Sequence, residues 1–120
     1  MTDEALSRLS GLSGKELDLL RAALAHDTGL TRAWIFGSRA KGTAKAASDI
    51  DIAVEGLQTN LQVEAARDRL NDLPLPYVVD VQAIEGIRNP ALREHIDRCG
   101  LLLLDNRQYT CARSPGDQQG

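Results

Sequence analysis

Three aspartates and a Gly-Ser pair are the residues of this 120-residue sequence whose types and spacing could do chemistry. Gly37 and Ser38 follow a short apolar run, and the first amides of a helix opening there could bind an anion. Asp49 and Asp51 stand two apart in an alternating segment, which puts both carboxylates on one face of a strand. Asp80 lies on the polar face of a later alternating segment. If these strands are neighbours, the three acids converge as in two-metal phosphoryl or nucleotidyl transfer sites.

Two further side chains flank this constellation. Arg39 is the cation nearest to the expected phosphates, to which its planar guanidinium could donate paired hydrogen bonds. Ser48 directly precedes the acid pair and could donate its hydroxyl to a phosphate or cap the turn. Lys41 and Lys45 add positive charge, and a plain solvated face remains the alternative interpretation of these three cations.

The elements that must position these residues follow from the periodicity of the apolar side chains. Caps, spacing and stop residues predict helices from Ser13 to Gly29, from Thr59 to Pro74 and from Asn89 to Gly100, with a weaker one over residues 3–9. Compact or alternating runs predict strands over residues 33–36, 49–52, 77–84 and 101–104. A turn and a short helix are expected between residues 37 and 47. This order is typical of an α/β fold.

The same patterns predict which side chains are buried. Residues 101–104, four consecutive leucines, are expected to form a fully buried strand. Trp34 and Phe36 alternate on one strand face and are expected in the core. Cys99 continues the apolar stripe of its helix and is expected there too. His95 stands alone on that helix, which favours a surface or interface position over a ligand.

The Gly-Ser pair, the ten residues after it, the Asp-x-Asp pair and the later aspartate strongly resemble the DNA polymerase β-like nucleotidyltransferase superfamily. Residues 30–105 resemble its minimal branch, the MNT-domain proteins, and residues 89–103 resemble the usual ending of that branch. The branch includes antitoxins paired with HEPN-domain ribonuclease toxins. The resemblance implies an α/β (in some schemes α+β) nucleotidyltransferase fold, with a small mixed β-sheet flanked by helices.

The resemblance also implies a role for each motif residue. Gly37 and Ser38 would bind the triphosphate of ATP, while Asp49 and Asp51 would hold Mg²⁺, with Mn²⁺ as an alternative. Asp80 matches the third acid, which binds the catalytic metal and helps to deprotonate the acceptor hydroxyl. Antitoxins of this type transfer AMP from ATP to a tyrosine of their toxin, so a HEPN-type toxin is the expected partner and AMPylation the expected reaction.

Two other functions remain open from the sequence. The domain could neutralise its partner by masking it, with chemistry secondary or absent. It could also be a small-molecule or RNA-end nucleotidyltransferase. We expect residues 1–112 to form one domain and residues 113–120 a disordered tail, which leaves no second domain to hold a drug. A protein acceptor is therefore the favoured substrate.

Composition argues against several classes of protein. A net charge of −3 and 3% aromatic residues provide neither a basic footprint nor stacking platforms, so we expect no strong nucleic-acid binding. No apolar run approaches the ~20 residues of a membrane span, and the acidic N-terminus does not resemble a secretory signal. The two cysteines fit no metal or disulfide pattern. We therefore expect a cytoplasmic protein without a membrane partner. A homodimer and a complex with the toxin are both compatible with the sequence.

Overall fold

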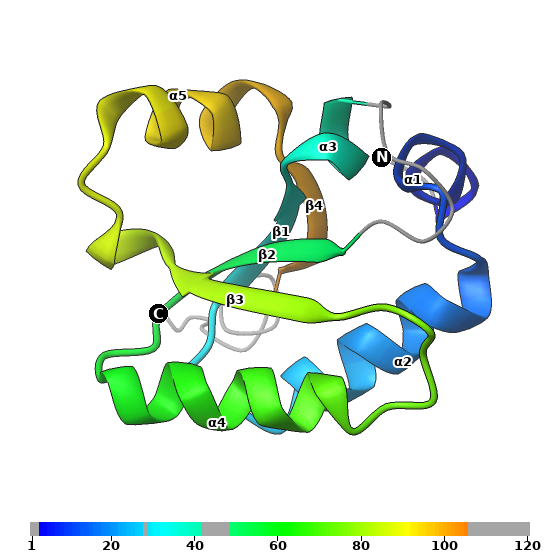
Figure 1. The fold of residues 1–120 in the computed structure, drawn as a ribbon, viewed down its shortest axis with the longest axis horizontal. Coiled ribbons are helices and arrows are strands. Elements are labelled where there is room, and N and C mark those ends of the chain that lie inside the picture. Colours follow the sequence, from blue (N-terminus) through cyan, green and yellow to red (C-terminus); the bar gives the residue numbers. More distant parts are fainter. Residues whose placement is uncertain (1–2, 28, 42–48, 106–120) are drawn as a thin grey trace, which may run out of the picture.

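A computed structural model describes residues 3–27, 29–41 and 49–105 of the chain (Figure 1). The helices are α1 (Asp3–Ser10), α2 (Gly14–Leu24), α3 (Ser38–Lys41), α4 (Asn60–Asn71) and α5 (Pro90–Cys99), with a 3₁₀ turn, η1 (Ile84–Gly86). The strands are β1 (Arg32–Phe36), β2 (Ile50–Glu55), β3 (Val79–Ala83) and β4 (Leu101–Asp105). Each strand predicted from the sequence is therefore present, with ends shifted by up to three residues. The expected tail and Ser48 lie outside the described residues.

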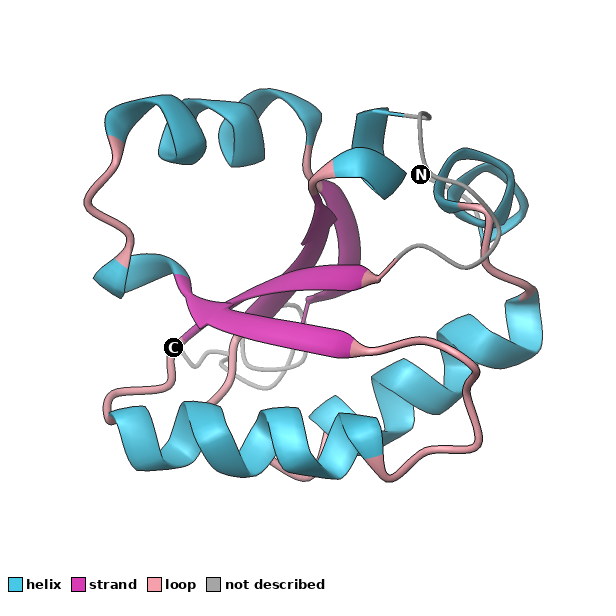
Figure 2. Ribbon diagram, in the orientation of Figure 1, coloured by secondary structure: helices cyan, strands magenta, loops and turns pink. Residues whose placement is uncertain are grey.

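The four strands form one mixed sheet in the order β3-β2-β1-β4. The central strands β1 and β2 are antiparallel, β1 and β4 are antiparallel, and β2 and β3 are parallel. Helices lie on both sides of this sheet, as the predicted fold class requires (Figure 2). The parallel pair matters most for function, because it sets the carboxylates of two sequence-distant strands side by side.

The two faces of the sheet have different cores. One face packs against α2 and α4, which lie together on one side of the sheet in Figure 1. Its core contains Leu17, Leu20, Ile35, Ile52 and Leu70, among others. The opposite face carries a smaller cluster of Phe36, Ala53, Ile84 and Ile96, with α5 above it. Because α5 covers only part of this second face, polar residues on β2 and β3 can lie beside the smaller cluster.

Side-chain caps fix where the longer helices begin. The predicted capping box is present at α2, where Glu16 N–H donates to Ser13 Oγ over 3.1 Å and Ser13 N–H donates to Glu16 Oε1 over 2.9 Å. Asn89 caps α5, and Pro90 stands at its first position as expected. The predicted end of α2 was too late, since the helix stops at Leu24 and Gly29 belongs to the turn before β1.

Three burial predictions need correction. Residues 101–104 are not fully buried, because β4 is an edge strand and Leu102, 40% exposed, points from the thinly covered face. Cys99 is exposed at the last residue of α5, beyond the part of the helix that packs on the sheet. Trp34 is only half-buried, and the Arg32 guanidinium lies 4.8 Å from its ring centroid.

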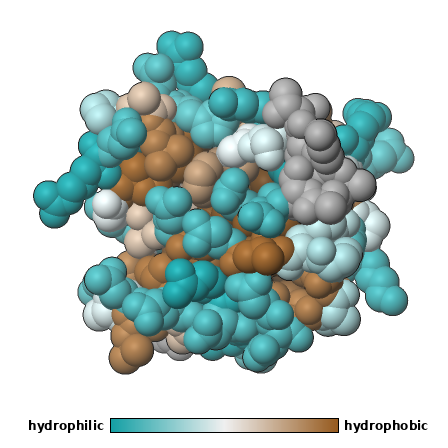
Figure 3. Space-filling model, in the orientation of Figure 1, coloured by the Kyte–Doolittle hydropathy of each residue, from teal (hydrophilic) through white to brown (hydrophobic). Residues whose placement is uncertain are grey.

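The surface is polar with apolar patches. In the view of Figure 3, hydrophilic side chains predominate and apolar ones show between them. The large apolar side chains that are most exposed are Leu61 and Val78. Among the described residues, no helix has both the length and the apolar character needed to cross a bilayer.

Candidate active site

The parallel pairing of β2 and β3 brings Asp51 and Asp80 side by side. The two residues are direct partners in the register of the strands. Alternation along β2 turns Ile50 and Ile52 fully into the core and leaves Asp51 half-buried on the other face. Val79 precedes Asp80 in the same alternation and is also buried. The sequence pattern therefore predicted the polar face for both acids, and the sheet topology makes their strands neighbours.

The charge of this pair is concentrated and partly desolvated. Burial raises the pKa of Asp51, and the negative charges of Asp80 and then of Asp49 raise that pKa further. Asp49 is exposed just before β2 begins. Within the described part of the chain, none of the three carboxylates is in an ion pair. This uncompensated negative charge would be relieved by a cation.

Gly37 brings the turn after β1 against the acid pair. Its φ is +77°, a left-handed conformation that side chains rarely adopt, and a Cβ atom there would lie 2.5 Å from Oδ2 of Asp51. The Gly37 carbonyl accepts the hydrogen bond from Lys41 N–H that closes the first turn of α3. Ser38, at the start of α3, follows directly. The expected anion-binding turn and the Asp51 carboxylate are thus in contact.

The side chain of Arg39 is buried between α3, α1 and the segment before β3. Its side chain is 2% exposed, and Nη1 donates a 3.0 Å hydrogen bond to the carbonyl of Ser10 in α1. The guanidinium also lies 4.6 Å from the ring centroid of Tyr77. Because the side chain turns into the protein, Arg39 ties α3 to α1 and to the segment before β3. These contacts give Arg39 a structural role, and the phosphate-binding role stays a prediction.

His95 is a site residue that the sequence did not reveal. Its Nε2 accepts a 3.0 Å hydrogen bond from the Gly37 N–H, across 58 residues of sequence. The residue is half-buried rather than free at the surface. No spacing within α5 signals this contact, because it depends on how α5 crosses the end of β1.

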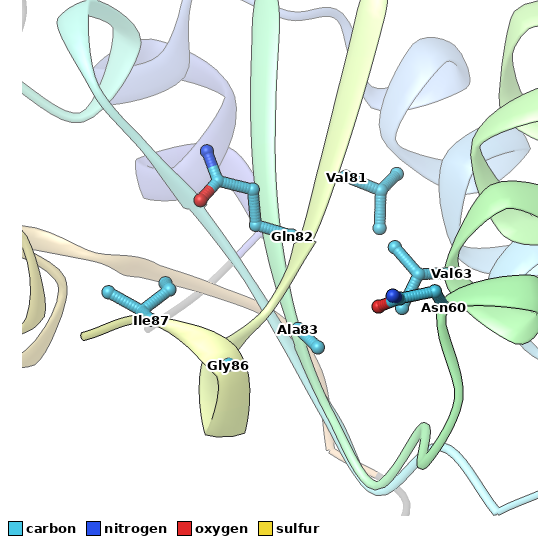
Figure 4. Close-up of a pocket in the computed structure, with 7 residues that line it drawn as sticks. All are labelled: Asn60, Val63, Val81, Gln82, Ala83, Gly86 and Ile87. Atoms are coloured by element: carbon cyan, nitrogen blue, oxygen red, sulfur yellow. The ribbon is translucent and has the colours of Figure 1, made fainter.

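A separate cavity of about 250 Å³ lies at the free edge of β3 (Figure 4). Figure 4 shows Val81 pointing toward Val63 and Asn60 of α4, whereas Gln82 points to the opposite side of the strand. Ala83, Gly86 and Ile87 complete the lining. None of these residues is titratable, and none was predicted as a site residue. The cavity therefore supplies no acid or base to the chemistry.

Residues 19–109 match the protein family described as "Polymerase beta, Nucleotidyltransferase". The chain belongs to this nucleotidyltransferase family, and the resemblance inferred from its sequence motifs is confirmed. No curated protein matches the sequence.

Solved structures of toxin–antitoxin complexes have a similar fold. One, described as a toxin–antitoxin with AMP-PNP, has a TM-score of 0.64 at 24% identity, over 78% of this chain and 76% of that one. A second, the toxin–antitoxin MntA-HepT, has a TM-score of 0.60 at 20% identity, over 81% and 76%. A third contains the tri-AMPylated Shewanella oneidensis HEPN toxin with its MNT antitoxin; its TM-score is 0.53 at 21% identity, over 91% and 77%. At these identities the similarity shows the fold.

The carboxylates fit the divalent cations that nucleotidyl transfer requires. Carboxylate oxygens are the ligands Mg²⁺ prefers, and the raised pKa of Asp51 shows that the site favours neutralisation. Among the described residues, no group of three aspartate, glutamate, histidine or cysteine side chains is placed to hold a metal ion, so the protein side chains alone do not form the expected three-acid metal site. A Mg²⁺ bound beside Asp51 and Asp80 would need further ligands, and nucleotide phosphates are oxygen ligands of the kind it prefers.

Proposed function

We propose that this protein transfers AMP from ATP to a hydroxyl of a HEPN-type ribonuclease toxin, with a tyrosine as acceptor, and thereby acts as its antitoxin. The observation that carries the proposal is the contact of Asp51, the register partner of Asp80, with the Gly37 turn. Family membership supports nucleotidyl transfer, and the similar structures support the choice of partner and of AMP. ATP as donor agrees with a cytoplasmic location.

The Gly37–Ser38 turn would bind the triphosphate. It lies at the start of α3, a helix of four residues, where backbone amides could donate hydrogen bonds to a phosphate. Since Gly37 has no side chain, a phosphate can approach the backbone there closely. This places the nucleotide within reach of the acid pair, because the Gly37 turn already touches Asp51.

Asp49, Asp51 and Asp80 would hold the metal ions, which we propose to be two Mg²⁺, with Mn²⁺ as an alternative. When bound, such ions would neutralise the triphosphate and stabilise the charge of the leaving group. The acceptor oxygen forms a bond to the α-phosphorus as the bond to the bridging oxygen of pyrophosphate breaks. Asp80 would take the proton of the acceptor hydroxyl.

The test is intact-mass spectrometry of the cognate toxin after incubation with this protein, ATP and Mg²⁺. Wild type should add the mass of AMP, or a multiple of it, and Asp49→Ala should add none. Asp68→Ala, which removes an exposed carboxylate from α4, is the matched control and should behave as wild type. If the toxin stays unmodified while wild type and Asp49→Ala both form a stable complex with it, the protein acts by masking and the transferase proposal is wrong.

A further inference from the structure

The turn that bears Gly37 is held from outside by α5. The Gly37 N–H donates a hydrogen bond of 3.0 Å to His95 Nε2, which is an ordinary hydrogen-bond length. The acceptor lies on α5, more than fifty residues further along the chain. Figure 1 shows α5 and α3 on the same side of the sheet. Because Nε2 accepts, the imidazole is neutral with its proton on Nδ1 in this arrangement.

The His95 ring is itself fixed in place. Its centroid lies 6.4 Å from that of Phe36 at an interplanar angle of 67°, an edge-to-face contact. The next residue, Ile96, is buried against Phe36 and Ala53. The backbone approaches Gly100 so closely that a Cβ there would lie 2.5 Å from the Ile96 carbonyl oxygen, so the end of α5 is tightly folded. The acceptor is therefore on a helix that packs on the sheet through Ile96.

This contact has a consequence for nucleotide binding. The Gly37 N–H is already used by His95, so it is not the donor that binds a phosphate. Instead, the hydrogen bond orients the peptide between Phe36 and Gly37, and with it the start of α3. The same hydrogen bond helps to fix the distance between the turn and the Asp51 carboxylate, which occupies the space that a side chain at position 37 would need.

We propose that His95 is a positioning residue: it holds the Gly37–Ser38 turn in the conformation that receives the triphosphate beside Asp51. The proposal rests on the nucleotidyl transfer proposed above and deepens it. Two substitutions test the hydrogen-bond acceptor and the aromatic ring of His95 separately. His95→Gln keeps an acceptor oxygen at nearly the position of Nε2, whereas His95→Phe keeps a ring against Phe36 and has no acceptor.

The experiment measures AMP transfer and amide exchange in the full chain. In His95→Phe, KM for ATP should rise about tenfold while KM for the acceptor protein stays within about twofold, as expected for loss of one hydrogen bond at the nucleotide turn. His95→Gln should stay near wild type in both. His26→Phe changes an exposed histidine after α2 and is the matched control.

Exchange of the Gly37 amide hydrogen, followed by NMR without nucleotide, is the second readout. It should be about tenfold faster in His95→Phe than in wild type or His95→Gln. If His95→Phe fails to fold, His95→Asn, whose amide is too short to reach, takes its place. Unchanged exchange, equal KM values in all variants, or equal damage from Gln and Phe would overturn the proposal. If wild type transfers no AMP but the exchange rates differ as stated, the proposed reaction is wrong, whereas the positioning of the Gly37–Ser38 turn by His95 is supported.

Discussion

Oδ2 of Asp51 lies where a side chain at Gly37 would begin. A Cβ atom at position 37 would be 2.5 Å from that oxygen, and the φ of +77° disfavours any side chain there in addition. The nucleotide turn and the acid pair are therefore one packed unit. A shift of either residue changes the distance between the expected triphosphate and the carboxylates.

Gly37→Ala should consequently destabilise the fold and abolish nucleotide binding. An alanine at positive φ costs more than about 1 kcal/mol, and the contact with Asp51 adds to it. Gly14→Ala is the matched control, because a Cβ at Gly14 in α2 meets nothing within 4 Å and φ there is ordinary. Urea denaturation and ATP binding would show the difference. Equal stability of the two variants would contradict the close contact.

Asp51→Asn should raise the stability of the metal-free protein at neutral pH while abolishing AMP transfer. Burial and then the charges of Asp80 and Asp49 raise the pKa of Asp51 in the folded state, so folding favours its protonated form. The wild type should lose stability as the pH rises from the ordinary aspartate value of about 4 through the raised pKa, and stay lower above it. Asp51→Asn has no carboxyl group to ionise at this position, so its stability should not fall in this way over the same pH range.

Thermal melts in EDTA across this pH range would measure the effect. Addition of Mg²⁺ and ATP should stabilise wild type more than Asp51→Asn, because only the wild-type carboxylate can share the metal with the nucleotide. A variant that melts below wild type without metal at neutral pH would refute the idea of repelling acids.

Arg39→Met should cost stability rather than nucleotide affinity. The change leaves the Ser10 carbonyl without this donor and removes the cation above the Tyr77 ring, a loss of about 1–3 kcal/mol. Arg98→Met, at the exposed end of α5, should be close to neutral. Urea midpoints and KM for ATP, measured on the folded variants, separate the two roles. A large rise in KM for ATP with unchanged stability would show instead that Arg39 contributes to phosphate binding.

Asn71→Ala should loosen the strand that carries Asp80. The Asn71 side chain donates to the Val79 carbonyl over 2.8 Å and accepts from the Val79 N–H over 2.9 Å, so it acts as a pairing partner for the start of β3. Loss of both hydrogen bonds should cost about 1–3 kcal/mol and lower AMP transfer. Asn71→Asp keeps only the acceptor and should recover part of the stability. Chemical denaturation of the three proteins tests this order.

Much of the acid pair could be predicted from local pattern. The alternation in β2 and β3 assigned Asp51 and Asp80 to the polar faces of strands, because side chains on a strand point to opposite faces in turn. The caps at Ser13 and Asn89 were equally readable, since they depend on residues two or three apart. Which strands are neighbours is not local, and the pairing of Asp51 with Asp80 was an assumption until the sheet was seen.

Arg39 and His95 show where local pattern ends. Arg39 was assigned to the phosphates because it follows Ser38, yet Ser10 and Tyr77, both distant in sequence, turn its side chain inward. His95 shows no periodic signal, yet the crossing of α5 over β1 brings it to Gly37. Short-range geometry makes the approximate elements, the strand faces and the family motif predictable from the sequence. Which side chains meet depends on packing between distant elements and is visible only in the folded structure.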